Sequence, residues 1–136
     1  MYNWLKDHKI YIIYIPLVLY WILIFVLTTI PASSIPEIFG LTDKLKHISA
    51  YFGLAVLLGL TLHYQNKFPY MKKFFLLFTI IIIAVYGALD EIHQMLVPNR
   101  TCDIFDWIAD LGGGLIGIIL IYLFIKFRRK LLPGEI

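Results

Sequence analysis

The sequence predicts an all-α, polytopic membrane protein folded as an antiparallel bundle of four transmembrane helices. Of its 136 residues, 60% belong to the set AVILMFWYC, against about 45–50% apolar residues in typical globular domains. Only 15% are charged, and the mean hydropathy is +0.81. Disordered and nucleic-acid-binding domains need charge-rich surfaces, so both classes are excluded, and no nucleic-acid partner is expected. Uncharged runs of membrane-spanning character occur four times along the chain.

The first predicted span covers residues 10–30, which include no Asp, Glu, Lys or Arg. A span needs about 20 such residues. Pro16 is expected to kink this helix. A cleaved signal peptide is the rival interpretation, because Lys6 and Lys9 precede the run and small residues follow it at 32–34. The run is longer than the usual apolar region of a signal peptide, which favours a retained span.

The other predicted spans cover residues 46–64, 74–95 and 105–126. The uncharged parts of the last two are short, at 16 and 15 residues. They reach only about 24 Å and 22 Å at 1.5 Å per residue, less than a hydrocarbon core of about 30 Å. The acidic residues beside them are therefore expected to be drawn into the membrane. These residues are Asp90, Glu91, Asp106 and Asp110.

Basic residues are distributed unevenly over the segments outside the spans. Nine of the 12 Lys and Arg residues lie before the first span, between the second and third, or after the fourth. By the positive-inside rule, both termini are expected to be cytoplasmic. The sequence has no internal repeat or second domain, so residues 1–136 are predicted to form a single transmembrane domain. Its one cysteine, Cys102, cannot form an internal disulfide, so the cysteine content does not indicate an oxidising or a reducing compartment.

Antiparallel connectivity places the start of the second span, the end of the third and the start of the fourth on the same side. Seven acidic residues gather there: Glu37, Asp43, Asp90, Glu91, Asp103, Asp106 and Asp110. The possible counter-charges are Lys44, Lys46, Arg100 and His47. Residues three or four apart share a helix face, which groups Asp43 with His47 and Tyr51, Asp90 and Glu91 with Gln94, and Asp106 with Asp110. Because hydrocarbon favours polar faces turned inward, these groups are expected to share a cavity.

Not every acid in this set needs a functional role. Glu37 and Asp103 are interpreted as hydrated or capping residues, which the helix dipole favours near a helix start. For Asp90, Glu91 and Asp110 the span lengths require burial, so an internal network or site is favoured.

The histidines divide in the same way. Asp43 lies one helical turn before His47 and is expected to orient its imidazole, although a purely structural Asp–His hydrogen bond has the same sequence pattern. His63 and His93 lie off the polar stripes and are interpreted as interfacial.

Arg100 follows Pro98 in a tight connection. Its planar guanidinium can bind two carboxylates or an incoming phosphate or carboxylate. A structural Arg–Asp pair that closes the loop between the third and fourth spans fits the spacing equally well.

Gly113 and Gly117 form a GxxxG pair, which allows helix backbones to approach closely. Ala84, Gly87 and Ala88 offer a matching small face on the third span. An intramolecular contact between these faces is favoured over a homodimer interface.

Three motifs together resemble the VanZ-like family over about Leu41–Gly117. They are Asp43-Lys44-x-x-His47-x-x-x-Tyr51-Phe52, then Gly87-x-x-Asp90-Glu91-x-x-Gln94-x-x-x-Pro98-x-Arg100, then Asp106-x-x-x-Asp110. The chain departs from the family pattern at Asp110, where Asn is expected. The resemblance implies a small multi-span protein of the bacterial cytoplasmic membrane. The founding member is associated with low-level resistance to the lipoglycopeptide teicoplanin. Some members are labelled phosphotransbutyrylases, a label for which this sequence offers no supporting site.

The first functional hypothesis is a binding or resistance protein. Its partners are membrane lipid and either a cell-envelope precursor or a lipoglycopeptide. The candidate ligand-binding residues are Lys44, Gln94, Arg100, Asp106 and Asp110. Lys44 and Arg100 supply positive charge for an anionic group.

Alternative functions remain open at this point. An intramembrane enzyme acting on a lipid-linked phosphate could use Asp43, His47, Asp90 and Glu91 as catalytic residues. A divalent cation could be held by Asp90, Glu91 and His47, since carboxylates and imidazoles are common metal ligands. A proton- or ion-coupled transporter would need a homodimer to enclose a pathway, and a structural membrane subunit is a further possibility.

Overall fold

The computed structural model describes residues 10–31 and 43–131. Its elements are the π-helix η1 (Ile10–Tyr14) and the α-helices α2 (Ile15–Thr29), α3 (Asp43–Tyr64), α4 (Pro69–Lys73), α5 (Phe75–Gln94) and α6 (Ile104–Leu131). Four helices are long and apolar enough to cross a membrane: Tyr11–Thr29, α3, α5 and α6. The described residues contain no strand, and the predicted all-α bundle of four spans is confirmed.

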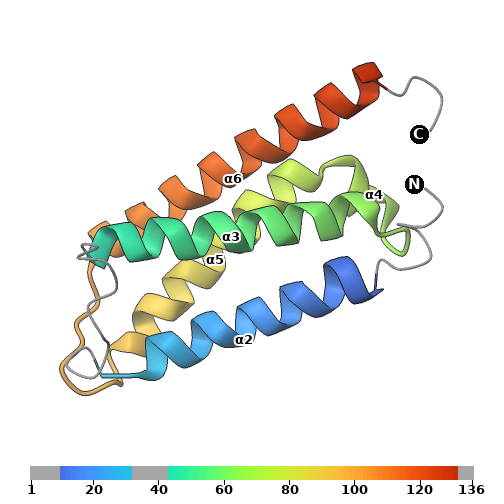
Figure 1. The fold of residues 1–136 in the computed structure, drawn as a ribbon. Coiled ribbons are helices and arrows are strands. Elements are labelled where there is room, and N and C mark those ends of the chain that lie inside the picture. The colour runs from blue at the N-terminus through green and yellow to red at the C-terminus, as the bar shows by residue number, and fades with distance from the viewer. Residues whose placement is uncertain (1–9, 32–42, 132–136) are drawn as a thin grey trace.

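The four long helices run side by side and alternate in direction (Figure 1). The blue start of α2 and the red end of α6 lie at one end of the bundle, and the connection between α5 and α6 lies at the other. Helix α6 packs most extensively on α3, and α5 packs on both of them. Helix α2 contacts α3 and α5 but is mostly exposed, which suits a helix whose remaining surface faces lipid.

Two local features follow from proline. Pro16, which was expected to kink the first span, lies in the first turn of α2 directly after the π-helix η1 and has no N–H to donate to the preceding turn. Pro69 begins the short helix α4, which the sequence analysis did not predict. The side chain of Gln65 bonds both the backbone N and the carbonyl O of Phe68, at 2.8 Å each, and fixes the turn that leads into α4.

Glycines allow α6 to lie directly against α3. A Cβ at Gly113 would meet the carbonyl oxygen of Ile48, and one at Gly117 would meet Ala55 and the carbonyl oxygen of Phe52. The GxxxG pair therefore makes an intramolecular contact, as expected, but the predicted partner was wrong. The pair faces α3 and not the small residues of α5.

The small face of α5 receives side chains from the first turns of α6 instead. The indole N–H of Trp107 donates to the carbonyl oxygen of Ala84 over 2.9 Å, and Asp110 lies against Gly87. A half-buried indole needs both space and an acceptor, and this face of α5 supplies both. The contact fixes the rotation of α6 and aims Asp110 toward α3.

Candidate functional site

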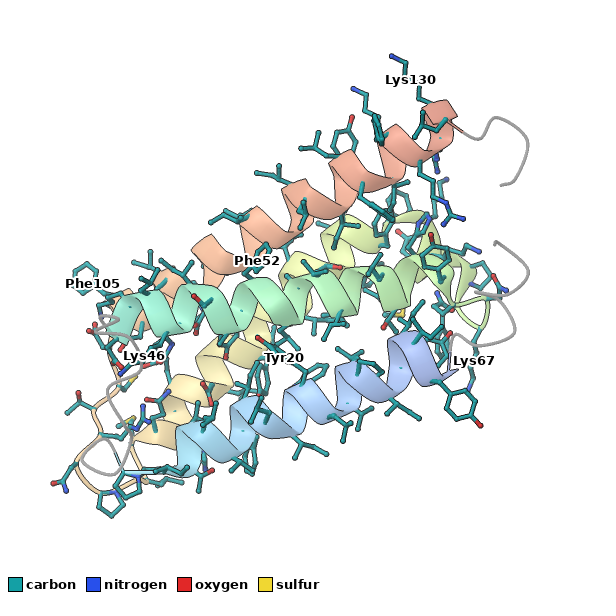
Figure 2. All side chains as sticks on the ribbon, viewed as in Figure 1. Tyr20, Lys46, Phe52, Lys67, Phe105 and Lys130 are labelled. Atoms are coloured by element: carbon teal, nitrogen blue, oxygen red, sulfur yellow. The ribbon has the colours of Figure 1, made fainter. Side chains whose placement is uncertain are left out.

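A polar cluster lies inside the bundle at the end where α3 and α6 begin and α5 finishes. Its members are all buried: His47, Tyr51, Asp90, Glu91, Gln94, Asp106 and Asp110. Figure 2 shows Lys46 and Phe105 at this end, with Lys67 and Lys130 at the opposite end. The burial of four acids within membrane-spanning helices agrees with the expectation drawn from the short uncharged runs.

The centre of the cluster is the contact between His47 and Asp110. The Nδ1 atom of His47 lies 2.9 Å from Oδ1 of Asp110, whose exposed fraction is 0%. On the other side of the ring, Nε2 lies 4.0 Å from Oδ2 of Asp106. The carboxylate that orients His47 thus comes from α6.

The prediction that Asp43 orients His47 was wrong. Asp43 is exposed, and its nearest charged partner is the Nζ atom of Lys46, at 3.8 Å. The close packing of α6 on α3 brings Asp110 to the imidazole, which a single helix face could not reveal.

Asp103 and Lys44 fasten the start of α6. Oδ1 of Asp103 accepts the backbone N–H of Phe105 over 2.8 Å, as expected for a residue that caps a helix. The ammonium group of Lys44 donates to the carboxylates of both Asp103 and Asp106. Lys44 therefore ties α3 to the first turn of α6.

The ion pair of Asp103 gives a testable pH dependence outside the spans. Its hydrogen bond with Lys44 lowers the pKa of the Asp103 carboxyl from its ordinary value. A lowered folded-state pKa means that the contact contributes stability above the ordinary pKa and loses it as the pH falls through the folded-state value. We expect Lys44→Met to raise the pKa of Asp103 in an NMR titration, whereas Lys67→Met should leave it unchanged.

The two acids of α5 have different partners. Oδ2 of Asp90 accepts from the hydroxyl of Tyr51 and from Nε2 of Gln94, both at 3.4 Å. Oε2 of Glu91 accepts the backbone N–H of Asp103 over 2.9 Å. The expected pairing with Gln94 therefore holds for Asp90, whereas Glu91 secures the loop before α6.

Arg100 closes the loop after α5 onto the end of α2. Its Nε and one terminal nitrogen donate to the carbonyl oxygens of Ile30 and Leu27, at 3.2 Å and 3.3 Å. The other terminal nitrogen donates to Oε1 of Gln94 over 3.1 Å. Within residues 10–31 and 43–131 no carboxylate pairs with Arg100, so the predicted Arg–Asp pair is not formed. The carbonyl oxygens at the C-terminal end of α2 attract the guanidinium instead.

The turn before Arg100 depends on one unusual backbone conformation. Asn99 has a φ of 60°, in the left-handed region that Asn tolerates better than most residues. The sequence identified Arg100 as a candidate site residue but did not predict that it would donate to carbonyl oxygens at the end of α2. Every residue has a backbone carbonyl, so the sequence does not show which carbonyls will accept hydrogen bonds from Arg100. It shows only that the C-terminal end of the first span is uncharged.

Two cavities meet at Arg100. The polar mouth, about 400 Å³, is lined by Asp43, Lys44, Lys46, Gln94, Asn99, Arg100, Thr101, Asp103 and Asp106. The apolar groove between α2 and α3, about 150 Å³, is lined by Ile24, Leu27, Thr28, Asp43, Lys46, His47, Ala50, Tyr51, Asp90 and Arg100. Asp43, Lys46 and Arg100 line both cavities, so the mouth and the groove are neighbours.

Two groups of side chains are close enough to hold a metal ion. One consists of Asp43, His47 and Asp106, and the other of His47, Glu91 and Asp110. In each group the ligand atoms lie within 4.8 Å of one another. Asp90, which the sequence analysis had grouped with Glu91 and His47, belongs to neither.

His63 and His93 lie outside the polar cluster. The ring of His93 stacks on Phe25, with 5.1 Å between centroids. His63 contacts the rings of Tyr64 and Phe75 at the opposite end of the bundle. Their separation from the cluster agrees with the sequence analysis.

Fold and site define a multi-pass membrane protein in which three helices enclose carboxylates and a histidine beneath a polar mouth. The VanZ/LLP1 family matches residues 12–125, and the chain belongs to that family. No curated protein and no solved structure matches the chain.

Proposed function

We propose that this VanZ/LLP1 protein binds an amphiphilic cell-envelope ligand whose anionic group lies in the polar mouth and whose apolar chain lies in the groove between α2 and α3. The observation that supports the proposal is that the polar mouth and the apolar groove lie next to each other and share Lys46 and Arg100 in their linings. A ligand with a charged head and a hydrocarbon chain needs both environments side by side.

Arg100 is the group best placed to receive an anion. Its three hydrogen-bond acceptors, on Leu27, Ile30 and Gln94, are all neutral, so its charge is not cancelled by a bonded carboxylate. Guanidinium groups bind phosphate and carboxylate oxygens in a planar, two-point geometry. Lys44 donates to two carboxylates, whereas Lys46 has one longer ion pair, of 3.8 Å, with the exposed Asp43, so Lys46 is the second cation of the proposed site.

The other predicted ligand-binding residues take different places in this proposal. Gln94 and Asp106 line the polar mouth, where their side chains can bond the polar head of a ligand. Asp110 lies beneath them, fully buried, and acts through His47. A lipid-linked precursor and a lipoglycopeptide such as teicoplanin both combine a polar head with a hydrocarbon chain, and we propose this class of ligand.

The effect on resistance can be measured in a bacterial deletion strain carrying wild type or Arg100→Gln. Relative to the deletion strain alone, we expect wild type to raise the inhibitory concentration of teicoplanin. The strain carrying Arg100→Gln should show at most about one-quarter of that increase. Arg129→Gln, at the far end of α6, should behave as wild type. A glycopeptide without an acyl chain controls for the tail, and equal protection against both drugs would contradict the proposal. Membrane levels of each variant must be equal.

We also propose that the polar mouth faces the outside of the bacterial cytoplasmic membrane and that both termini are cytoplasmic. The support is the excess of basic residues at the opposite end of the bundle. Cys102 is exposed in the connection between α5 and α6 and is the only cysteine in the chain.

A membrane-impermeant maleimide should therefore label Cys102 in intact cells. In a Cys102→Ser background, Lys130→Cys should react only after the membrane is permeabilised. The reverse pattern of labelling would show that the orientation is inverted.

A second candidate function is acid–base chemistry on a lipid-linked phosphate, favoured by the buried His47–Asp110 pair beside the groove. A positioned imidazole can transfer a proton to or from a reacting group. If this candidate is correct, purified protein should hydrolyse a polyprenyl diphosphate, with water attacking the terminal phosphorus, to the polyprenyl phosphate and inorganic phosphate. His47→Gln should abolish the release of inorganic phosphate. Binding without turnover would leave only the binding function.

A further inference from the structure

Three buried side chains from three helices meet beneath the apolar groove. We call His47 of α3, Glu91 of α5 and Asp110 of α6 the inner triad. Their ligand atoms lie within 4.8 Å of one another, and their exposed fractions are 7%, 3% and 0%. The three helices are held together independently of this contact by the glycine packing of α6 on α3 and by the bond from Trp107 to α5.

The hydrogen bonds of the inner triad are incomplete. Oε1 of Glu91 and Oδ2 of Asp110 are buried and have no hydrogen-bond partner among the residues described. Such oxygens are unfavourable in an apolar interior unless they are protonated or contact a cation.

The neighbouring fixed cations are engaged elsewhere. Lys44 donates to Asp103 and Asp106, and Arg100 donates to Gln94 and to carbonyl oxygens of α2. In the part of the chain that the structure describes, no Lys or Arg forms an ion pair with Glu91 or Asp110. The triad thus combines two acids and one imidazole without a fixed positive charge in contact.

We propose that the inner triad binds one divalent first-row transition-metal ion. One imidazole nitrogen and two carboxylate oxygens are ligands that suit Zn²⁺ or Mn²⁺. Ligands about 2.1 Å from such an ion and at neighbouring positions lie about 3.0–3.4 Å apart. Nδ1 of His47 and Oδ1 of Asp110 are 2.9 Å apart along a hydrogen bond. Binding would therefore displace the shared proton, and the two side chains would shift so that both atoms and an oxygen of Glu91 can contact the ion.

The experiment uses purified full-length protein in detergent, stripped with a chelator. Zn²⁺ binding is followed by calorimetry, and Mn²⁺ binding by electron paramagnetic resonance. We expect one saturable site per chain. Glu91→Gln and Asp110→Asn should each weaken Zn²⁺ binding by at least about tenfold, because each removes a charged ligand.

Asp43→Asn is the matched control. Asp43 belongs to the other possible metal group, with His47 and Asp106, and not to the inner triad. Asp43→Asn should therefore bind Zn²⁺ within about twofold of wild type. Elution volume and helix content report whether each variant is folded, and Glu91→Gln and Asp110→Asn both preserve side-chain shape.

Three results would overturn the inference. If folded wild type shows no saturable Zn²⁺ or Mn²⁺ binding, protons alone satisfy the acids. If Asp43→Asn weakens Zn²⁺ binding and Glu91→Gln does not, the ion binds to the group of Asp43, His47 and Asp106. If equimolar Mg²⁺ displaces Zn²⁺, the site has no selectivity for transition metals. The inference does not rest on the proposed ligand, because metal binding is measured without an amphiphile.

Discussion

Gly113→Leu is expected to destabilise the bundle by about 3 kcal/mol or more, at the upper end of the range for overpacked cores. Any Cβ at this position meets the backbone carbonyl of Ile48, and a backbone cannot move aside as a flexible side chain can. The leucine therefore forces α6 away from α3 and separates His47 from Asp110. Thermal or denaturant unfolding of the purified protein, followed by its helical signal, measures the effect.

Gly112→Leu is the matched control for this change. Gly112 is adjacent in the same helix, but nothing lies within 4 Å of a Cβ built there. Leucine has a higher helix propensity than glycine by up to about 1 kcal/mol, so this variant should be as stable as wild type or slightly more so. Equal destabilisation by both variants would show that the α3–α6 contact is not as close as described.

His47→Ala is expected to cost about 3 kcal/mol, the upper end of the cost of leaving a buried polar group without its hydrogen-bond partner. The change leaves Oδ1 of Asp110 without its imidazole partner in a fully buried position. The free energy of unfolding, measured by denaturant titration, tests the expectation. His63→Ala is the control, since His63 makes ring contacts at the other end of the bundle.

A double-mutant cycle separates the pair from simple loss of packing. If His47 and Asp110 stabilise the fold through each other, the combined His47→Ala and Asp110→Ala variant should lose clearly less than the sum of the two single changes. Strict additivity would mean that the two residues act independently, and it would contradict the central place of this contact in the cluster.

Hydropathy and span length predicted the fold and the depth of the acids. Sixteen uncharged residues cannot cross the membrane alone, which is why Asp90 and Glu91 had to lie within the helix that precedes the loop. The same reasoning applied to Asp106 and Asp110, and the structure buries all four. Antiparallel connectivity then placed the four acids at one end without further information.

The pairing of side chains could not be predicted, because it depends on the rotation of each helix about its axis. Helical spacing joined Asp43 to His47, but the helix contact at Gly113 brings Asp110 to the imidazole instead. The GxxxG motif was recognised, but the helix predicted to pack against it was wrong for the same reason. Small faces were present on two helices, and in the structure the small face of α6 packs on α3 while that of α5 receives Trp107.

The role of Arg100 was open for a different reason. Its partners include backbone carbonyls at the end of α2, about 70 residues away in sequence. Because every residue has a backbone carbonyl, the sequence cannot identify these two as partners. A lone basic residue in a loop after an acidic helix end suggested an Arg–Asp pair. The structure instead leaves this guanidinium among neutral acceptors, where the proposed anion can approach.

The most direct test of the account is binding of a polyprenyl phosphate to the purified protein in nanodiscs. We predict saturable binding by wild type and at least tenfold weaker binding of both the uncharged polyprenol and inorganic phosphate. Arg100→Gln should weaken binding of the polyprenyl phosphate by a similar factor, and Arg129→Gln should not. Equal binding by wild type and Arg100→Gln would contradict the assignment of the anion site to Arg100.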